Sequence, residues 1–146
     1  MLLGFKRQFA PFVENGTNTH TLRGLRKSHK LSHSQRSPRV GETAHCYVDP
    51  RQKTMRLLGR FPIVKVDPVT LDFEAFGIAY RLRVTIADQT LSHDEAVEFA
   101  RRDGFRGDDP LAEMARFWIS TKRLSDALDS RPWHGQIIHW RYPDGD

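Results

Sequence analysis

Apolar residues recur with the spacing of a helix in three segments of the chain, residues 6–15, 92–104 and 109–122. This period matches the 3.6 residues of a helical turn, so each segment predicts a short helix with one buried face. The second segment has the strongest start signal, because Ser92 and Glu95 form a capping-box pattern. We therefore expect three short helices.

Apolar and polar residues alternate in other segments, which is typical of strands. Residues 43–48 and 54–66 predict two strands joined by a turn at 49–52. Gly59 predicts a bulge in the second of these strands, and Pro62 predicts an edge or a kink. We expect further strands at residues 81–86 and 135–140, a brief extended segment at 19–23, and a less regular stretch around Phe73 and Phe76.

Residues 26–39 are polar and basic and contain almost no apolar side chains, so they predict a mobile loop. The order of the other elements predicts an α+β fold, with a small curved sheet or barrel and helices packed on its outside. The 146 residues of the chain fit one domain, so we expect a single domain over residues 1–146.

The net charge of +5 is distributed unevenly along the chain. Residues 1–16 carry a net charge of +1, residues 17–60 carry +8, and residues 61–146 carry −4. Positive charge gathered in one block indicates a face that binds a polyanion. The alternative is a basic loop that serves only to keep the protein in solution.

The remaining composition excludes several classes of protein. Cys46 is the one cysteine, so the chain has neither a disulfide framework nor the thiolates of a zinc cluster. We expect this thiol to be buried and inert, with a nucleophile assisted by His45 as the alternative. No apolar run is long enough to span a bilayer, and the N-terminus lacks the pattern of a secretory signal. We expect a cytoplasmic protein with no membrane partner, no cofactor and no bound metal.

The stretch Gly-Thr-Asn-Thr-His-Thr-Leu-Arg at residues 16–23 resembles the Gly-x-Lys-x-x-Thr-x-Arg signature of ASCH domains, which are relatives of the PUA domain. Other stretches similar to that family follow in the same order along nearly the whole chain. They are residues 40–43, 51–59, 103–105 and 133–140.

The resemblance implies a PUA-like β-barrel of five or six strands, flanked by three short helices and with a cleft suited to RNA. Some members of the family look like metal-free ribonucleases, and others hydrolyse N4-acylated cytidine. Thr21 and Arg23 match the signature, but Asn18 stands where it has a lysine. An asparagine side chain can act neither as a base nor as an ammonium group, so the amidohydrolase becomes the less favoured activity. The resemblance also implies an acidic residue after the barrel strands as partner of the signature lysine, and this residue has two candidate counterparts, Glu74 and Asp103.

A metal-free ribonuclease needs a base for the 2′-hydroxyl, cations around the phosphorane and a proton for the leaving oxygen. The turn at 49–52 would place Tyr47 and Lys53 at one rim, where Lys53 would stabilise the phosphate charge and Tyr47 would stack a base or relay a proton. Ser130 could add a hydroxyl group, and Thr21 joins the candidates through the resemblance. The alternative is that Lys53 only contacts phosphate and Tyr47 belongs to the core.

Basic residues would hold the RNA backbone and make binding sensitive to salt. We favour single-stranded RNA over double-stranded RNA, because its bases can stack on aromatic side chains. For Arg23 the alternative is a structural role inside the barrel. For His20 the alternatives are an acid–base group and a histidine that faces solvent. The candidate RNA-binding residues are Arg23, Arg26, Lys27, Arg51 and Arg56.

The leading hypothesis is therefore an RNA-binding ASCH domain that acts as a metal-independent ribonuclease on single-stranded RNA through a basic cleft. A non-catalytic RNA-binding module is the nearest alternative, and it predicts salt-dependent affinity without turnover. An amidohydrolase of acylated cytidine and a DNA-binding accessory protein are further alternatives.

Overall fold

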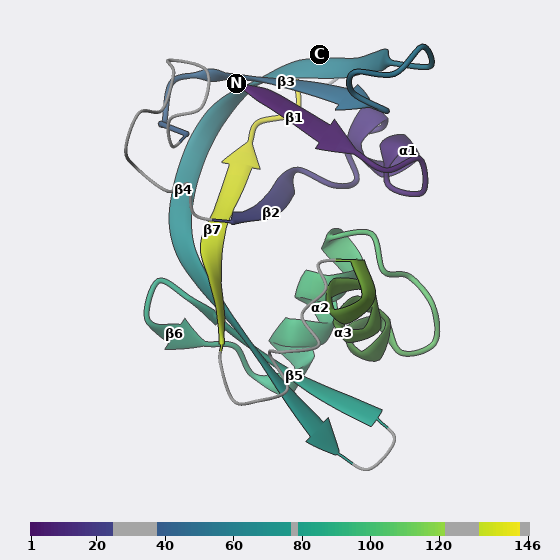
Figure 1. The fold of residues 1–146 in the computed structure, drawn as a ribbon. Coiled ribbons are helices and arrows are strands. Elements are labelled where there is room, and N and C mark those ends of the chain that lie inside the picture. Colours follow the sequence, from purple (N-terminus) through teal and green to yellow (C-terminus); the bar gives the residue numbers. More distant parts are fainter. Residues whose placement is uncertain (25–37, 77–78, 122–131, 144–146) are drawn as a thin grey trace. The chain divides into compact units, whose positions relative to one another are not determined.

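The computed structural model describes residues 1–24, 38–76, 79–121 and 132–143 (Figure 1). The chain divides into two compact units, which the prediction of one domain did not distinguish. Met1–Val66 and Ile137–Asp146 form what we call the N-terminal unit, and Asp67–Gln136 form the central unit. Most of the predicted basic loop, residues 26–37, lies outside the described residues.

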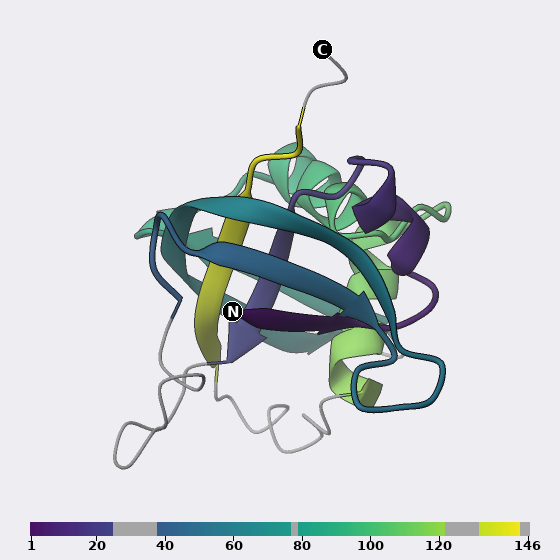
Figure 2. The ribbon, with the colours of Figure 1, turned by 90° about the horizontal axis from the view of Figure 1, so that it is seen from above.

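The N-terminal unit is built on β1 (Leu2–Phe5), β3 (Thr43–Val48) and the first part of β4 (Arg56–Phe76). Strand β1 runs parallel to β3, and β3 runs antiparallel to β4, so the three strands lie side by side in Figure 2. Strand β7 (Trp133–Trp140) pairs with both β4 and β2 (His20–Gly24). The short helix α1 (Ala10–Glu14) follows β1 and has Pro11 in its first turn, where the missing N–H costs nothing.

Alternation along these strands puts one row of apolar side chains into the core. Leu3 of β1 and Ala44 and Cys46 of β3 are almost completely buried. The ring of Phe61 stacks on Trp140 with centroids 5.9 Å apart. Burial raises the pKa of the Cys46 thiol to about 12, so the thiol stays protonated at neutral pH. The predicted buried cysteine is confirmed, and its protonated state argues against the nucleophile.

The predicted bulge at Gly59 is confirmed. Cys46 pairs with Gly59 but the next residue, Tyr47, pairs with Leu57, so Leu58 is the extra residue in β4. A Cβ atom on Gly59 would lie 2.3 Å from Cζ of Phe61. Glycine is therefore favoured here, because a side chain at this position would have to displace the Phe61 ring from its stack on Trp140.

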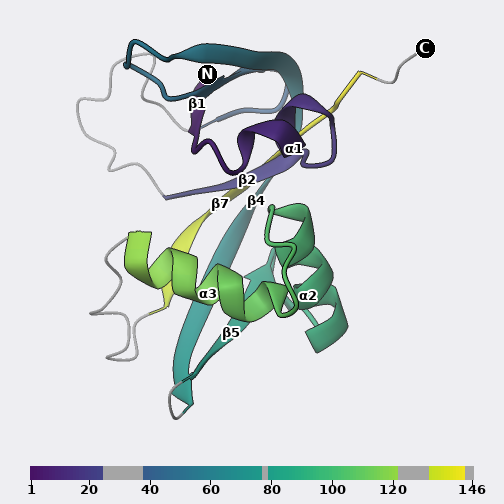
Figure 3. The same cartoon turned by 90° about the vertical axis from the view of Figure 1, so that its right-hand side faces the viewer.

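The central unit contains the second part of β4, β5 (Ala79–Ile86), β6 (Gln89–Thr90), α2 (His93–Arg102) and α3 (Pro110–Thr121). Helices α2 and α3 pack on one another, and α3 packs on β5 (Figure 3). The predicted capping box is confirmed at α2. The backbone N–H of Glu95 donates to Ser92 Oγ at 3.2 Å, and that of Ser92 donates to Glu95 Oε1 at 2.9 Å. The core of this unit includes Leu71, Val84, Met114 and Trp118.

The α+β class and the three helices agree with the prediction, but the sheet differs from it in two ways. The described strands follow the order β1-β3-β4-β5-β6, with β1 and β6 at its ends, so they do not close into a barrel. The stretch around Phe73 and Phe76 is not irregular, because β4 continues as far as Phe76 and pairs with β5. Strands β1 and β6 were missed, since four and two residues are too short to establish alternation. No helix within the described ranges has the length and apolar character needed to cross a membrane.

Candidate nucleic-acid interface

The fold separates the charges of the chain between its two units. The N-terminal unit contains fourteen Lys and Arg residues against five Asp and Glu residues, a net charge of +9. The central unit contains nine basic and thirteen acidic residues, a net charge of −4. Residues 1–66 supply the positive excess of the N-terminal unit with thirteen basic and three acidic residues, because residues 137–146 add one arginine against two aspartates.

Within the described part of the N-terminal unit, two carboxylates are neutralised by arginines. Arg7 Nε donates to Asp49 Oδ2 at 2.8 Å, and Thr54 Oγ1 donates to the same oxygen at 2.9 Å. These hydrogen bonds from Arg7 and Thr54 hold the pKa of the Asp49 carboxyl below its usual range. Arg56 forms an ion pair with Glu14 of α1. Arg56, predicted to bind RNA, is thus engaged with the protein itself.

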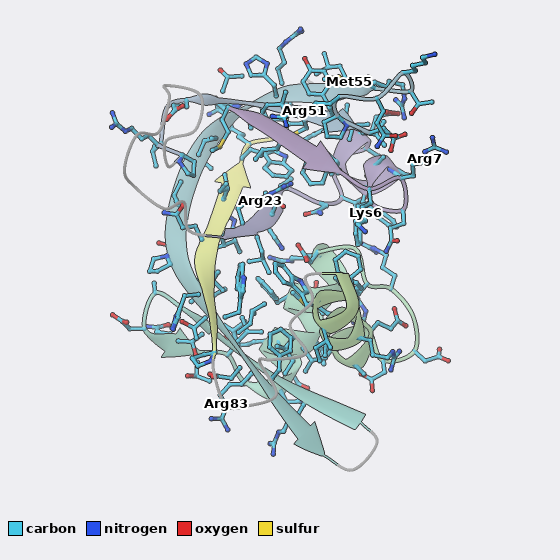
Figure 4. All side chains as sticks on the ribbon, viewed as in Figure 1. Lys6, Arg7, Arg23, Arg51, Met55 and Arg83 are labelled. Carbon is cyan, nitrogen blue, oxygen red and sulfur yellow. The ribbon has the colours of Figure 1, made fainter. Side chains whose placement is uncertain are left out.

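Five exposed cations of the N-terminal unit have no carboxylate partner within the described residues. Two of them, Arg51 (labelled in Figure 4) and Lys53, lie in the loop that joins β3 to β4. This loop is held by backbone hydrogen bonds from Gln52 to Asp49 at 3.2 Å and from Met55 to Gln52 at 3.0 Å. The cations therefore project from an ordered turn. The five are Arg39, Arg51, Lys53, Arg60 and Arg141.

Arg60 shares the outer face of the sheet with two aromatic rings. Residues that pair across an antiparallel ladder point to the same face, and Arg60 pairs with His45. Tyr47 lies two residues beyond His45 in β3, so it lies on that face as well. Leu2 of β1 pairs with His45 and is 50% exposed. The outer face thus presents a cation, two rings and an aliphatic side chain.

His45 is held in its neutral form by its surroundings. Partial burial lowers its pKa, and the positive charges of the chain's amino group and of Arg60 lower it further. The ring therefore contributes an uncharged surface near neutral pH. Its neighbour Arg60 supplies the permanent charge of this face.

Arg23 has a structural role in the N-terminal unit. Its Nη2 donates to the Gly4 carbonyl oxygen at 2.7 Å, and its guanidinium lies 5.2 Å from the centroid of the Phe5 ring. A Cβ on Gly4 would lie 2.5 Å from Cγ of Pro50, so β1 also touches the β3–β4 loop closely. Arg23 thus joins β2 to β1, which agrees with the structural alternative. Its guanidinium is partly buried and is not among the exposed cations.

The signature-like segment at residues 16–23 lies largely in the interior. Asn18, His20 and Thr21 are only 2%, 5% and 7% exposed. Asn18 Oδ1 accepts a hydrogen bond from the backbone N–H of His20 at 3.1 Å, and the His20 ring meets His139 edge-on at 5.7 Å. Asn18 therefore stabilises a turn, and His20 does not face solvent as one alternative supposed. Thr21 is likewise withdrawn from the outer face that carries Tyr47.

The residues predicted for catalysis are not joined into one group. Tyr47 is half-buried and Lys53 is exposed, and neither side chain makes a hydrogen bond within the described part of the chain. Ser130, Arg26 and Lys27 lie outside the described residues. No group of three or more metal-binding side chains occurs among the described residues.

The sequence pattern named His45 only as the assistant of a nucleophilic Cys46, and it did not single out Arg60. A turn at 49–52 would pair His45 with Arg56, because residues equally distant from a turn pair across a hairpin. In the structure the loop is longer, since Val48 pairs with Arg56, and the bulge adds one more residue, so His45 pairs with Arg60. No protein-family model, curated protein or solved structure matches the chain.

Proposed function

We propose that this protein is a non-catalytic module that binds single-stranded RNA on its N-terminal unit. The surface that supports this proposal consists of Tyr47, Arg51, Lys53 and Arg60 with His45 beside them, and we call it the hairpin surface. The observation that carries the proposal is the set of three cations without a carboxylate partner among the described residues, next to two rings on one sheet face. Such a combination of charge and ring surface is what proteins use to bind single strands.

The charges of the unit favour a polyanion as the partner. A net charge of +9 attracts phosphates over a range of about 8 Å at physiological salt. Its carboxylates Glu14 and Asp49 are already paired with arginines, so they add little repulsion. A polynucleotide is a better partner for this surface than a small anion, because the cations are spread along the hairpin and not gathered into a pocket.

The rings favour RNA with unpaired bases. Bases in a duplex are stacked on one another, whereas the bases of a single strand can stack on Tyr47 and His45. Each such stack is worth roughly 1–3 kcal/mol. The resemblance of residues 16–23 to the ASCH signature favours RNA over DNA as the polynucleotide. Membership of that PUA-like family is part of the proposal.

The geometry supports binding better than cleavage. Cleavage without a metal needs a base and an acid within hydrogen-bonding reach of the reacting groups. Thr21 is buried, and Tyr47 and Lys53 make no hydrogen bond within the described residues that would set up proton transfer. The predicted ribonuclease activity remains a prediction, to be tested in the same preparation.

Fluorescence anisotropy with a labelled oligouridine of about twelve nucleotides tests the proposal. We expect binding that weakens with salt and that is tighter for the single strand than for a duplex of the same length. A parallel incubation in the presence of a chelator, analysed by gel electrophoresis, should show intact RNA. Absence of binding in dilute buffer would overturn the proposal, and cleavage that is lost in Lys53→Ala would replace it with the ribonuclease.

A further inference from the structure

The central unit contains a pocket of about 470 Å³ that the proposed RNA surface does not include. Its walls come from β5, from the segment between β6 and α2, and from the first turn of α3. This size lies within the range of ligand pockets. The side chains that define its chemistry are Arg81, Leu82, Arg83, Leu91, Ala96 and Leu111.

One wall of the pocket is a strand edge that no described strand covers. The Val84 carbonyl oxygen accepts from the backbone N–H of Leu91 at 2.9 Å, on the β6 side of β5. Backbone groups along a strand alternate sides, so the N–H and C=O of Leu82 point to that same side. Strand β6 pairs only with Thr85 and Ile86, and the chain then leaves for α2. The backbone groups of Leu82 therefore lack a strand partner within the described residues.

The two faces of β5 differ sharply in chemistry beside this edge. Leu82 and Val84 point inward and are 4% and 0% exposed. Arg81 and Arg83 (the latter labelled in Figure 4) point to the opposite face and are exposed. Glu74 and Asp72 of β4 stand opposite them in the ladder, but neither arginine forms an ion pair in the part of the chain that the structure describes. A strand added at this edge would extend both faces, so its side chains would meet the two arginines on one side and the apolar side chains of the pocket on the other.

The helix ends at the pocket do not make it an anion site by themselves. Ser92 Oγ already accepts the N–H of Glu95, and Asp109 Oδ1 accepts the N–H of Ala112 at 3.2 Å. The Asp109 carboxylate also adds negative charge at that end. The unpaired positive charge of the site therefore comes from the arginines of β5.

A second copy of this chain is a poor occupant of the edge. Antiparallel pairing of two β5 strands about Leu82 would place Arg81 of each copy opposite Arg83 of the other. Like charges directly opposite one another are unfavourable, and charged side chains at strand edges are a known protection against self-association. A strand with acidic residues opposite Arg81 and Arg83 would instead form two favourable charge pairs.

We propose that the open edge of β5 binds an extended peptide segment of a partner protein, in which acidic residues alternate with a small aliphatic residue. An acidic residue lies opposite Arg81, an aliphatic residue opposite Leu82 and a second acidic residue opposite Arg83. The aliphatic side chain enters the pocket toward Leu91, Ala96 and Leu111, and its backbone N–H and C=O pair with those of Leu82. This mode is strand addition, in which main-chain hydrogen bonds give affinity and alternate side chains give specificity.

The peptide acetyl-Thr-Glu-Val-Glu-Thr-amide is the probe, added to the 146-residue chain labelled with nitrogen-15 and observed by NMR. We expect amide shifts at residues 81–84 and around Leu91 and Leu111, with no change at the hairpin surface. A peptide with lysines in place of the glutamates should bind at least about tenfold more weakly, because two cross-strand charge pairs are reversed. Methylating the valine nitrogen, which removes the N–H that pairs with Leu82, should weaken binding as well.

A charge exchange keeps the proposal testable if the probe is weak. The double variant Arg81→Glu/Arg83→Glu should lose the glutamate peptide and gain the lysine peptide. It also sets glutamates opposite Glu74 and Asp72 in the β4–β5 ladder, so its thermal unfolding shows whether the fold is retained. A second variant, Arg81→Gln/Arg83→Gln, avoids this repulsion and should lose the preference for the glutamate peptide. If the N-methylated peptide binds as tightly as the unmethylated one, the site binds small anions. If the glutamate and lysine peptides bind equally to the parent, the contact is apolar alone. Either result would overturn strand addition. RNA binding on the N-terminal unit should be unchanged by the double glutamate variant, so the two proposals fail separately.

Discussion

Replacing Arg51, Lys53 and Arg60 together by glutamine removes three positive charges from the hairpin surface and keeps long polar side chains there. All three are exposed and make no ion pair within the described residues, so the fold should tolerate the change. Surface substitutions of this kind usually alter stability by less than about 0.5 kcal/mol. Any loss of RNA binding would therefore report on contacts with RNA.

The size of the effect follows from counterion release. Each phosphate neutralised on a single strand contributes about −0.7 to the slope of log affinity against log salt, so three contacts contribute about −2. When salt rises from about 50 to 200 mM, the part of the affinity that these three phosphate contacts contribute falls by about 20-fold. The triple variant should lose affinity most at low salt, and its slope should be shallower than that of the parent by about 2.

The control of equal charge is Arg101→Gln/Arg102→Gln/Arg116→Gln, which removes three positive charges from exposed positions on α2 and α3, where Arg101 and Arg102 are paired with Glu98. Anisotropy titrations at four or more salt concentrations give both slopes. We expect the control to keep nearly the parent slope. If control and triple variant lose affinity equally, the binding reflects total charge, and the hairpin surface is not the site.

Three further predictions concern the elements that support the two sites. Gly59→Ala should lower the free energy of unfolding by about 1–3 kcal/mol in chemical denaturation, because the new Cβ would collide with Phe61. Ser92→Ala should cost about 1 kcal/mol through loss of the α2 cap, whereas Ser92→Asp should retain most of the stability. His45→Gln should reduce the loss of stability on acidification, because the pKa of His45 is lowered in the fold. The contribution of this lowered pKa to the free energy of unfolding is present above the unfolded pKa of about 6.5 and is lost as the pH falls through the folded pKa. A parent and a variant with parallel stability curves between pH 7 and 5 would contradict the last of these.

The sequence predicted local structure well wherever one signal was strong. The capping box at Ser92 and Glu95 satisfies two backbone N–H groups locally, so it needs no information about distant residues. The bulge at Gly59 was also predicted, since a glycine inside a strand pattern often marks a bulge or a close approach of another group. The length of β4 was not predicted, because its continuation to Phe76 depends on pairing with β5 and not on its own alternation.

The candidate site was predicted only in part, because the sequence does not show which basic side chains are engaged by other groups of the protein. Arg51 and Lys53 could be selected because they lie in a turn, where side chains are exposed whatever the fold. Arg56 and Arg23 looked equivalent to them in sequence, yet Glu14 neutralises the first and the Gly4 carbonyl accepts from the second. A basic residue becomes available to a ligand only when no neighbour in space has engaged it, and spatial neighbours cannot be read from spacing along the chain.

The distribution of unpaired charge also explains why the two proposed sites favour opposite kinds of partner. The N-terminal unit keeps unpaired cations on a broad sheet face, where a chain of phosphates can lie across several of them. The central unit is acidic as a whole, but β5 holds two arginines beside an uncovered strand edge. The net negative charge of that unit opposes both a polynucleotide and an acidic peptide. A short acidic strand gains backbone hydrogen bonds that offset this repulsion and that RNA cannot supply. Binding of oligouridine to the triple variant with shifts at residues 81–84 would contradict this separation, since it would show that β5 accepts RNA.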